Sequence, residues 1–206
     1  MIEVEKKFLL TRKEQEVLLL GAEKISVSSE ADIYFDYPDW RLTCSDIWLR
    51  ERNGRPEVKI PITGNGRVGS TDRYREIDSS SKEVLTAVGI SFEDGLNFQG
   101  HLFRDGLVRI ADIITNRSKY RKDGFTIDVD DADFGNGEVH YSIVEVELLV
   151  GDESEAQMAE DRIFEFARCH GILPTKHARG KLIEYICRYR REHFSALLKA
   201  GVVSHR

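Results

Sequence analysis

The sequence has 206 residues, of which 41% are hydrophobic and 32% charged, so it can bury one substantial core. Its formal net charge of −6 argues against a general nucleic-acid binder, which needs a basic field to displace counterions from phosphates. We therefore expect a single domain over residues 1–206, and any phosphate-binding site must be local.

The first half of the chain predicts short strands and two helices. Period-2 alternation over Ile2–Phe8 predicts a strand, and helical spacing over residues 11–20, closed by Gly21, predicts a helix. The serines at 79–81 are good capping residues for a second helix, which should end at Gly89. Further strand-like runs are separated by turn residues, among them Gly64-Asn65-Gly66. These runs cover residues 31–37, 47–52, 57–60 and 73–77.

The second half of the chain repeats this organisation and then ends in helices. Strand patterns cover residues 107–114, 117–122, 125–130 and 141–150, and two amphipathic helices follow over residues 155–169 and 180–194. Short strands with helices between them favour an α+β protein with an eight-stranded antiparallel β-barrel, because closure removes exposed strand edges. We expect the helices to pack on the outside of this barrel.

The cysteines and the N-terminus predict a cellular compartment. Cys44, Cys169 and Cys187 are odd in number and lack metal-ligand spacing, which indicates neither a disulfide framework nor a zinc site. The chain starts with charged residues, and no run reaches the length of a membrane span. We expect a soluble, cytoplasmic monomer without nucleic-acid or membrane partners.

Charged residues recur at i and i+2 along several predicted strands, so they project from one face of each strand. Glu3, Glu5 and Lys7 share a face of the first strand, and the opposite face of several strands is apolar. The other sets are Trp48 with Arg50 and Arg52, Glu57 with Lys59, Arg117 with Lys119 and Arg121, Asp128 with Asp130, and Glu145 with Glu147.

For any single strand, a solvated outer face is the simpler interpretation, because charged residues are mostly exposed. The whole set favours a different one. Helices need apolar strand faces to pack against, and if they cover the outside of a barrel, the charged faces point inward. Such an interior needs mixed signs, water and a charged ligand, because each unpaired buried ion costs several kcal/mol.

The charged residues divide into two sets with different chemistry. Carboxylates are hard oxygen donors suited to Mg²⁺, or alternatively Mn²⁺, whereas arginine forks match phosphate oxygens. This division indicates phosphoryl transfer. The predicted metal ligands are Glu3, Glu5, Asp128, Glu145 and Glu147. The predicted polyanion-binding residues are Lys7, Arg50, Arg52, Lys59, Arg117 and Lys181.

The chain resembles the triphosphate tunnel metalloenzymes, also called CYTH proteins. Their N-terminal Glu-x-Glu-x-Lys strand matches Glu3-Val4-Glu5-Lys6-Lys7, and the resemblance covers nearly the whole chain. It is strongest to the branch of the family that hydrolyses thiamine triphosphate. Further matching stretches are Tyr34-Phe35-Asp36, Trp48-Leu49-Arg50-Glu51-Arg52, Glu57-Val58-Lys59, Thr115-Asn116-Arg117-Ser118, Asp128-Val129-Asp130, Glu145-Val146-Glu147 and Lys181-Leu182-Ile183.

The resemblance implies an eight-stranded tunnel that hydrolyses a triphosphate, its small-molecule substrate, to a diphosphate and orthophosphate with Mg²⁺. It assigns the metal and phosphate ligands to the two sets above, with Glu145 also contacting substrate. Trp48 matches an aromatic residue that stacks on thiamine, although ordinary core packing explains this tryptophan equally well. We expect Lys59 to act as general base, working with Tyr34.

Other functions stay open at this point. A tunnel of this kind also suits hydrolysis of inorganic tripolyphosphate or nucleoside triphosphates, or cyclisation of ATP. A non-catalytic sensor of polyphosphate or nucleotide, and a scaffold with solvated charged faces, are the alternatives from other functional classes.

Overall fold

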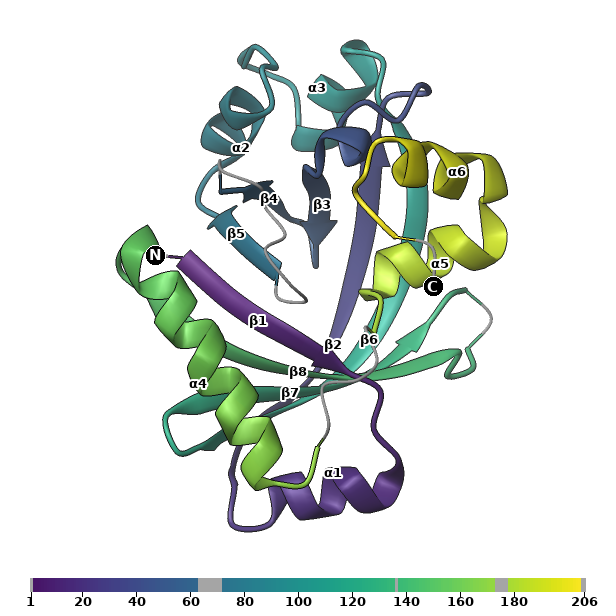
Figure 1. Cartoon of the computed structure of the whole chain (residues 1–206). Coiled ribbons are helices and arrows are strands. Elements are labelled where there is room, and N and C mark those ends of the chain that lie inside the picture. The colour runs from purple at the N-terminus through teal and green to yellow at the C-terminus, as the bar shows by residue number, and fades with distance from the viewer. Residues whose placement is uncertain (1, 63–71, 136, 173–177, 205–206) are drawn as a thin grey trace. The chain divides into compact units, whose positions relative to one another are not determined.

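The computed structural model describes residues 2–62, 72–135, 137–172 and 178–204. Its strands form a closed barrel in the order β1-β5-β4-β3-β2-β6-β7-β8. The strands are labelled in Figure 1. The predicted eight-stranded antiparallel barrel with accompanying helices is confirmed. The predicted turn Gly64-Asn65-Gly66 lies outside the described residues.

The strands are β1 (Ile2–Phe8), β2 (Glu23–Asp36), β3 (Trp48–Arg52), β4 (Arg55–Pro61), β5 (Asp72–Ile77), β6 (Val108–Lys122), β7 (Phe125–Asp133) and β8 (Tyr141–Val150). The α-helices within the described ranges are α1 (Arg12–Leu19), α2 (Ser81–Ala87), α3 (Phe98–Arg104), α4 (Ala156–Cys169), α5 (Lys181–Tyr189) and α6 (Arg191–Lys199). Short 3-10 turns cover Thr43–Ser45 and Glu153–Glu155. In the described part of the chain, every helix is too short or too polar to cross a lipid bilayer.

The chain divides into two compact units, each with its own core. Unit 1 comprises the described parts of Met1–Glu30, Ile62–Arg75 and Ile114–Lys181. Unit 2 comprises the described parts of Ala31–Pro61, Glu76–Ile113 and Leu182–Arg206.

The core of unit 1 forms where α4 covers the apolar face of β1 and β8. Helix α4 lies along β1 in Figure 1 and packs on both strands. Ile163 and Phe166 on the helix join Val4 and Val146 in one buried cluster. This packing takes one face of each strand, so the alternating residues, including Glu5 and the other charged side chains, lie on the opposite face.

The core of unit 2 is built from β2, β3 and β4 with helices α2 and α3. Phe35, Leu49 and Val58 supply strand side chains. Val84, Leu85 and Leu102 are fully buried helix residues that join them. Helix α2 starts after the predicted cap, with Ser80 accepting a hydrogen bond from the Glu83 amide. This core holds the strands that carry the arginine residues.

The structure differs from the element predictions in four places. Strand β2 begins at Glu23, eight residues before the run predicted at 31–37. The runs at 107–114 and 117–122 form one strand, because Thr115 and Asn116 pair with Ala132 and Asp131 on β7 instead of turning. The helix predicted over residues 180–194 breaks at Arg190, whose backbone leaves the helical region at φ −134 and ψ 63. Helix α3 was not predicted; it has seven residues, too few for a clear periodicity, and is capped by Asn97.

Candidate active site

A cluster of carboxylates lies on the charged face of β1 and β8 in unit 1. The antiparallel register places Glu5 opposite Glu147 and Lys7 opposite Glu145. One carboxylate oxygen from each of Glu3, Glu5 and Glu147 lies within 4.8 Å of the others. We call these three residues the acidic triad.

The acidic triad brings negative charges together in a poorly hydrated place. Burial, and then the neighbouring Glu3 carboxylate, raise the pKa of Glu147 to about 7. Lys7 forms an ion pair with Glu5, and Lys119 Nζ lies 3.5 Å from Glu147 Oε1. A cation with hard oxygen preference would stabilise the ionised form of this cluster.

Arg117 is the centre of a second part of the site in unit 1. Its guanidinium donates to both oxygens of Asp130, at 2.7 and 2.6 Å, and to Glu145 Oε2 at 3.0 Å. Its Nη1 also lies 2.6 Å from Asp128 Oδ2. Burial opposes the charged guanidinium, but Asp130 and the other carboxylates raise the pKa of Arg117 well above its ordinary value.

Two lysines complete this part of the site. Lys181, at the start of α5, pairs with Asp130 and lies 3.6 Å from Glu145 Oε1. Lys119 Nζ lies 3.2 Å from Asp128 Oδ2. Burial raises the pKa of Asp128, although Arg117 and Lys119 oppose the shift. Asp128 and Glu145 therefore share Arg117 as a cationic partner. In the acidic triad, Glu5 contacts Lys7 and Glu147 contacts Lys119.

Carboxylates predominate among the described side chains that these contacts join. Glu3, Glu5, Asp128, Asp130, Glu145 and Glu147 lie near the cations Lys7, Arg117, Lys119 and Lys181. Carboxylate oxygens are hard donors, so this donor set fits Mg²⁺ or Mn²⁺.

The second cluster, in unit 2, is built around two arginines of β3. Asp32 pairs with Arg52 in the β2–β3 register and accepts both of its hydrogen bonds, at 2.7 and 2.9 Å. Arg50 Nη1 lies 3.5 Å from Asp32, and Arg50 also pairs with Glu57, its register partner on β4. We call Asp32, Arg50, Arg52 and Glu57 the arginine cluster.

Arg50 is deeply buried and keeps one donor unused. Burial opposes its charge, yet Tyr34, Asp32 and Glu57 together raise the pKa of Arg50 well above the ordinary value. Its Nε is buried and has no hydrogen-bond partner among the described residues. Native proteins rarely leave such a donor unsatisfied, so this atom is a candidate contact for a bound anion.

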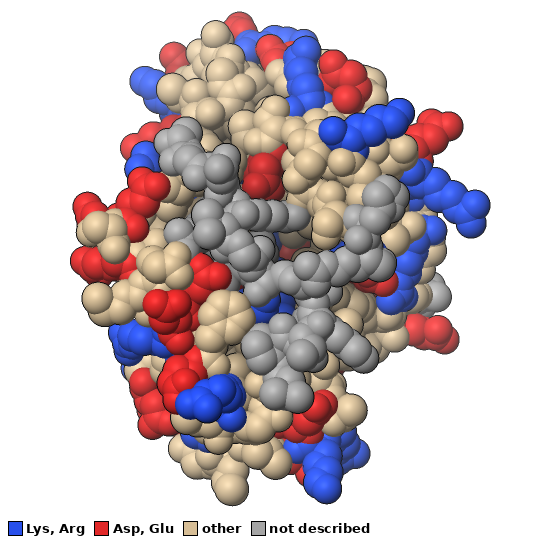
Figure 2. Space-filling model, viewed as in Figure 1, with Lys and Arg blue, Asp and Glu red and all other residues tan. Residues whose placement is uncertain are grey.

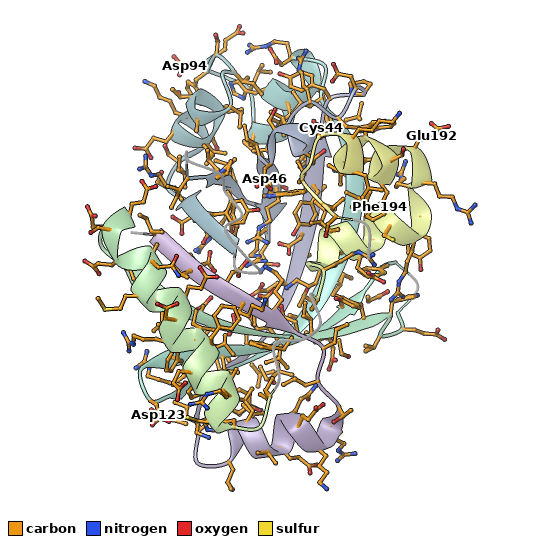
Figure 3. All side chains as sticks on the ribbon, in the orientation of Figure 1. Cys44, Asp46, Asp94, Asp123, Glu192 and Phe194 are labelled. Carbon is orange, nitrogen blue, oxygen red and sulfur yellow. The ribbon has the colours of Figure 1, made fainter. Side chains whose placement is uncertain are left out.

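Three further predicted residues lie on the strands of the arginine cluster. Tyr34 is buried on β2, and its hydroxyl accepts a hydrogen bond from Arg50 at 3.2 Å. Trp48 is buried opposite Lys59 in the β3–β4 register, and its indole N–H donates to Asp46 at 3.0 Å. Asp46, two residues before β3, is labelled in Figure 3.

The predicted site residues thus fall into two local groups. Unit 1 carries Glu3, Glu5, Lys7, Arg117, Asp128, Glu145, Glu147 and Lys181, and unit 2 carries Tyr34, Trp48, Arg50, Arg52 and Lys59. Sequence reasoning missed the roles of Asp32, Asp130 and Lys119. Alternation had already placed Lys119 and Asp130 on the charged faces, and it could have found Asp32, which lies two residues from Tyr34 on the same strand.

The outer surface differs from these buried clusters. On the described part of the face in Figure 2, basic and acidic side chains are interspersed. In contrast, Asp128, Asp130 and Asp32 are at most 1% exposed. Burying these ionised side chains costs free energy that exposed positions would not cost. Such burial is typical of a functional site.

Comparisons with known proteins agree with this organisation. A model of the CYTH domain matches residues 1–180. The chain is 31% identical to a human thiamine-triphosphatase over 219 aligned residues, which cover 98% of this chain and 91% of that protein. A thiamine-triphosphatase from Macaca fascicularis is 30% identical, with the same coverage.

Solved structures support the fold. The PH1819 protein from Pyrococcus horikoshii OT3 superposes with a TM-score of 0.64 and 23% identity, covering 91% of this chain and 99% of that one. An adenylyl cyclase homologue from Hippeastrum, described as having a dominant triphosphatase activity, superposes with a TM-score of 0.53 and 16% identity, covering 91% and 94%.

The chain belongs to the CYTH family. This membership confirms the resemblance noted in the sequence. It also confirms the prediction of a phosphoric anhydride hydrolase of the thiamine-triphosphatase type, because CYTH is a family of triphosphate hydrolases.

Proposed function

We propose that this enzyme hydrolyses thiamine triphosphate to thiamine diphosphate and phosphate in a Mg²⁺-dependent reaction. The observation that carries the proposal is the convergence of the acidic triad, Glu3, Glu5 and Glu147, within 4.8 Å. The identity to thiamine-triphosphatases along 98% of the chain supports the choice of substrate.

The acidic triad would hold the metal, with Mn²⁺ as an alternative to Mg²⁺. Bound there, the ion supplies charge neutralisation at phosphate oxygens. Asp128 and Glu145 complete the predicted ligand set, and Glu145 also contacts substrate in this proposal. In the structure both carboxylates also fix the Arg117 guanidinium.

The cationic residues bind and orient the triphosphate. Arg50 and Arg52 act as forks on phosphate oxygens, and the unpartnered Nε of Arg50 is one donor available for this purpose. Lys7, Lys59, Arg117 and Lys181 add further positive charge. Such groups stabilise the charge that spreads over the phosphoryl oxygens during transfer.

Specificity and proton transfer are assigned to three residues of unit 2. Trp48 presents an electron-rich ring to the flat cation of thiamine, with its indole fixed by the hydrogen bond to Asp46. Lys59 takes the proton from the attacking water, and Tyr34, already hydrogen-bonded to Arg50, assists it.

The remaining properties follow from the same proposal. We infer a single functional domain over residues 1–206 that acts as a cytoplasmic monomer on a small-molecule triphosphate. Neither nucleic acid nor membrane is needed as a partner.

The test compares hydrolysis rates on thiamine triphosphate, inorganic tripolyphosphate and ATP with Mg²⁺, Mn²⁺ or a chelator. We expect thiamine triphosphate to give the highest kcat/KM and the chelator to abolish turnover. Trp48→Ala should lower only the rate on thiamine triphosphate, whereas Trp48→Phe, the matched control, should retain most of it because the aromatic face remains.

Other outcomes would replace this proposal. A preference for tripolyphosphate that Trp48→Ala does not change would identify an inorganic tripolyphosphatase. Tight binding of triphosphates without phosphate release under any divalent ion would identify a sensor.

A further inference from the structure

A groove in unit 2 takes no part in the proposed reaction. It has a volume of about 450 Å³ and lies where α5 ends and α6 begins. This volume is in the range of small-molecule sites. The residues of the groove that matter here are Trp40, Tyr189, Arg190, Arg191, Glu192 and His193. All of them lie outside the acidic triad and the arginine cluster.

The groove contains the N-terminus of α6, where backbone N–H groups have no intrahelical acceptor. Arg190 occupies the capping position, and no side chain caps the helix in the described residues. Helix α6 carries Glu192 and Phe194, which are labelled in Figure 3. A helix N-terminus without its own cap attracts anions through its N–H groups and its dipole.

Arginine side chains reinforce the preference for an anion. Arg190 and Arg191 are exposed, and neither forms an ion pair with any described residue. Arg188, which also lines the groove, is occupied by Glu184 at 2.7 Å. Among the described residues of the lining, Glu192 is the one that is acidic, and the cations outnumber it.

Aromatic rings form another part of the lining. Trp40 adopts a positive φ of 61°, which is rare for a bulky residue and marks a constrained position. Its indole stacks on the His193 ring, with centroids 5.0 Å apart and planes 8° apart. Tyr189 is 52% exposed at the groove. Such surfaces suit a planar ring.

His193 adds a polar side chain to the lining of the groove. The side chain is only 2% exposed, and its Nε2 lies 2.7 Å from the Thr43 hydroxyl. Because the Thr43 hydroxyl donates to Asp36, the histidine tautomer with its proton on Nε2 fits this contact. The other ring nitrogen, Nδ1, is then an acceptor, and it has no partner in the described part of the chain.

We propose that this groove is a second ligand site that binds a small organic phosphate carrying a planar ring. The phosphate contacts Arg190, Arg191 and the N-terminus of α6, and the ring lies against Trp40 and Tyr189. A donor group on the ring can reach His193 Nδ1. The proposal does not depend on the hydrolytic activity.

The test uses tryptophan fluorescence of the Trp48→Phe variant. The chain has two tryptophans, so Trp40 is the only one left in this variant. AMP and thiamine monophosphate are titrated into the full-length protein without divalent cations. We expect a saturable change in Trp40 emission with both ligands, and weaker binding of inorganic phosphate, which lacks a ring.

Matched variants locate the binding. Arg190→Ala/Arg191→Ala should weaken ligand binding at least tenfold, because both side chains are exposed and their loss leaves the fold intact. Arg190→Lys/Arg191→Lys should retain most of the binding. Arg12→Ala/Arg168→Ala removes the same charge from exposed positions of unit 1 and should change nothing.

Two results would overturn the proposal: no saturable signal at millimolar ligand, or equal affinity in the Arg190→Ala/Arg191→Ala variant. Inorganic phosphate binding as tightly as AMP would contradict the role of the aromatic rings. Triphosphatase assays of the double alanine variant keep the two proposals apart, since its hydrolysis rate should equal that of the wild type.

Discussion

The acidic triad and the arginine cluster differ in how their buried charges are arranged. In unit 1 three glutamates converge. In unit 2 the arginines are paired with Asp32 and Glu57. One buried donor, Arg50 Nε, has no hydrogen-bond partner among the described residues. Converging carboxylates suit a metal ion, whereas an unused donor suits an anion, so each cluster indicates its own ligand.

The largest expected effect comes from weakening the acidic triad. Glu5→Gln keeps the shape of the side chain but removes a charged ligand, and kcat/KM should fall by about 1000-fold. The Mg²⁺ concentration needed for half-maximal activity should rise in parallel. Glu23→Gln, at an exposed position of β2, is the matched control and should be unaffected. Unchanged Mg²⁺ dependence in Glu5→Gln would refute the metal site.

Lys59→Arg tests whether Lys59 acts as a general base or only binds phosphate. A general base is lost with this change, because arginine stays protonated, and kcat should then fall by about 100-fold with little change in KM. The measurement is steady-state kinetics on thiamine triphosphate. If the variant keeps most of its kcat, Lys59 only binds phosphate and the base must be sought elsewhere.

Asp32→Asn tests whether the arginine cluster must be fixed by a buried carboxylate. The amide cannot accept both hydrogen bonds from Arg52, so the arginines lose their orientation, and kcat/KM should fall roughly 10- to 100-fold. Asp94→Asn, at an exposed position labelled in Figure 3, is the control. The melting temperature of both variants is also measured. It shows whether a loss of activity comes from a less stable protein or from the changed orientation of the arginines.

The smallest expected effect concerns the stability of unit 2. Burial, and then Arg190, lower the pKa of His193 from 6.5 to about 4. Between these values the unfolded chain binds more protons than the folded one, so this histidine makes stability fall as the pH drops from about 6.5 to 4. His193→Gln removes that contribution, and its melting temperature should change less over this pH range than that of the wild type. Parallel curves for the two proteins would contradict the prediction.

Much of this organisation could be predicted from residue alternation. The bounds of β1 and β8 match the prediction, because a strand buried on one face by α4 repeats every two residues. The same alternation identified the charged faces, since Glu145 and Glu147 alternate with buried valines.

The errors arose where no such pattern exists. Residues 23–30 of β2 are mostly exposed, so nothing distinguishes one face from the other. Thr115 and Asn116 look like turn residues, and only their partners on β7 keep them in the strand. The break at Arg190 involves neither glycine nor proline and left no local signal.

The site was harder to predict in detail than the fold. Alternation indicates which side chains share a face, but not which residue on a neighbouring strand each one contacts. Asp128 and Glu145 have the composition of metal ligands, yet both lie against Arg117 in the structure. That choice depends on strand register, which a single sequence does not specify.

The division of β1 into an apolar and a charged face makes enzymatic activity a measure of correct folding. A displacement of this strand by one residue would press Glu5 and Lys7 against the apolar side chains of α4 and turn Val4 toward the carboxylates. Such a misfolded form would be both inactive and unstable. After refolding from denaturant, recovered turnover should therefore track the amount of native protein.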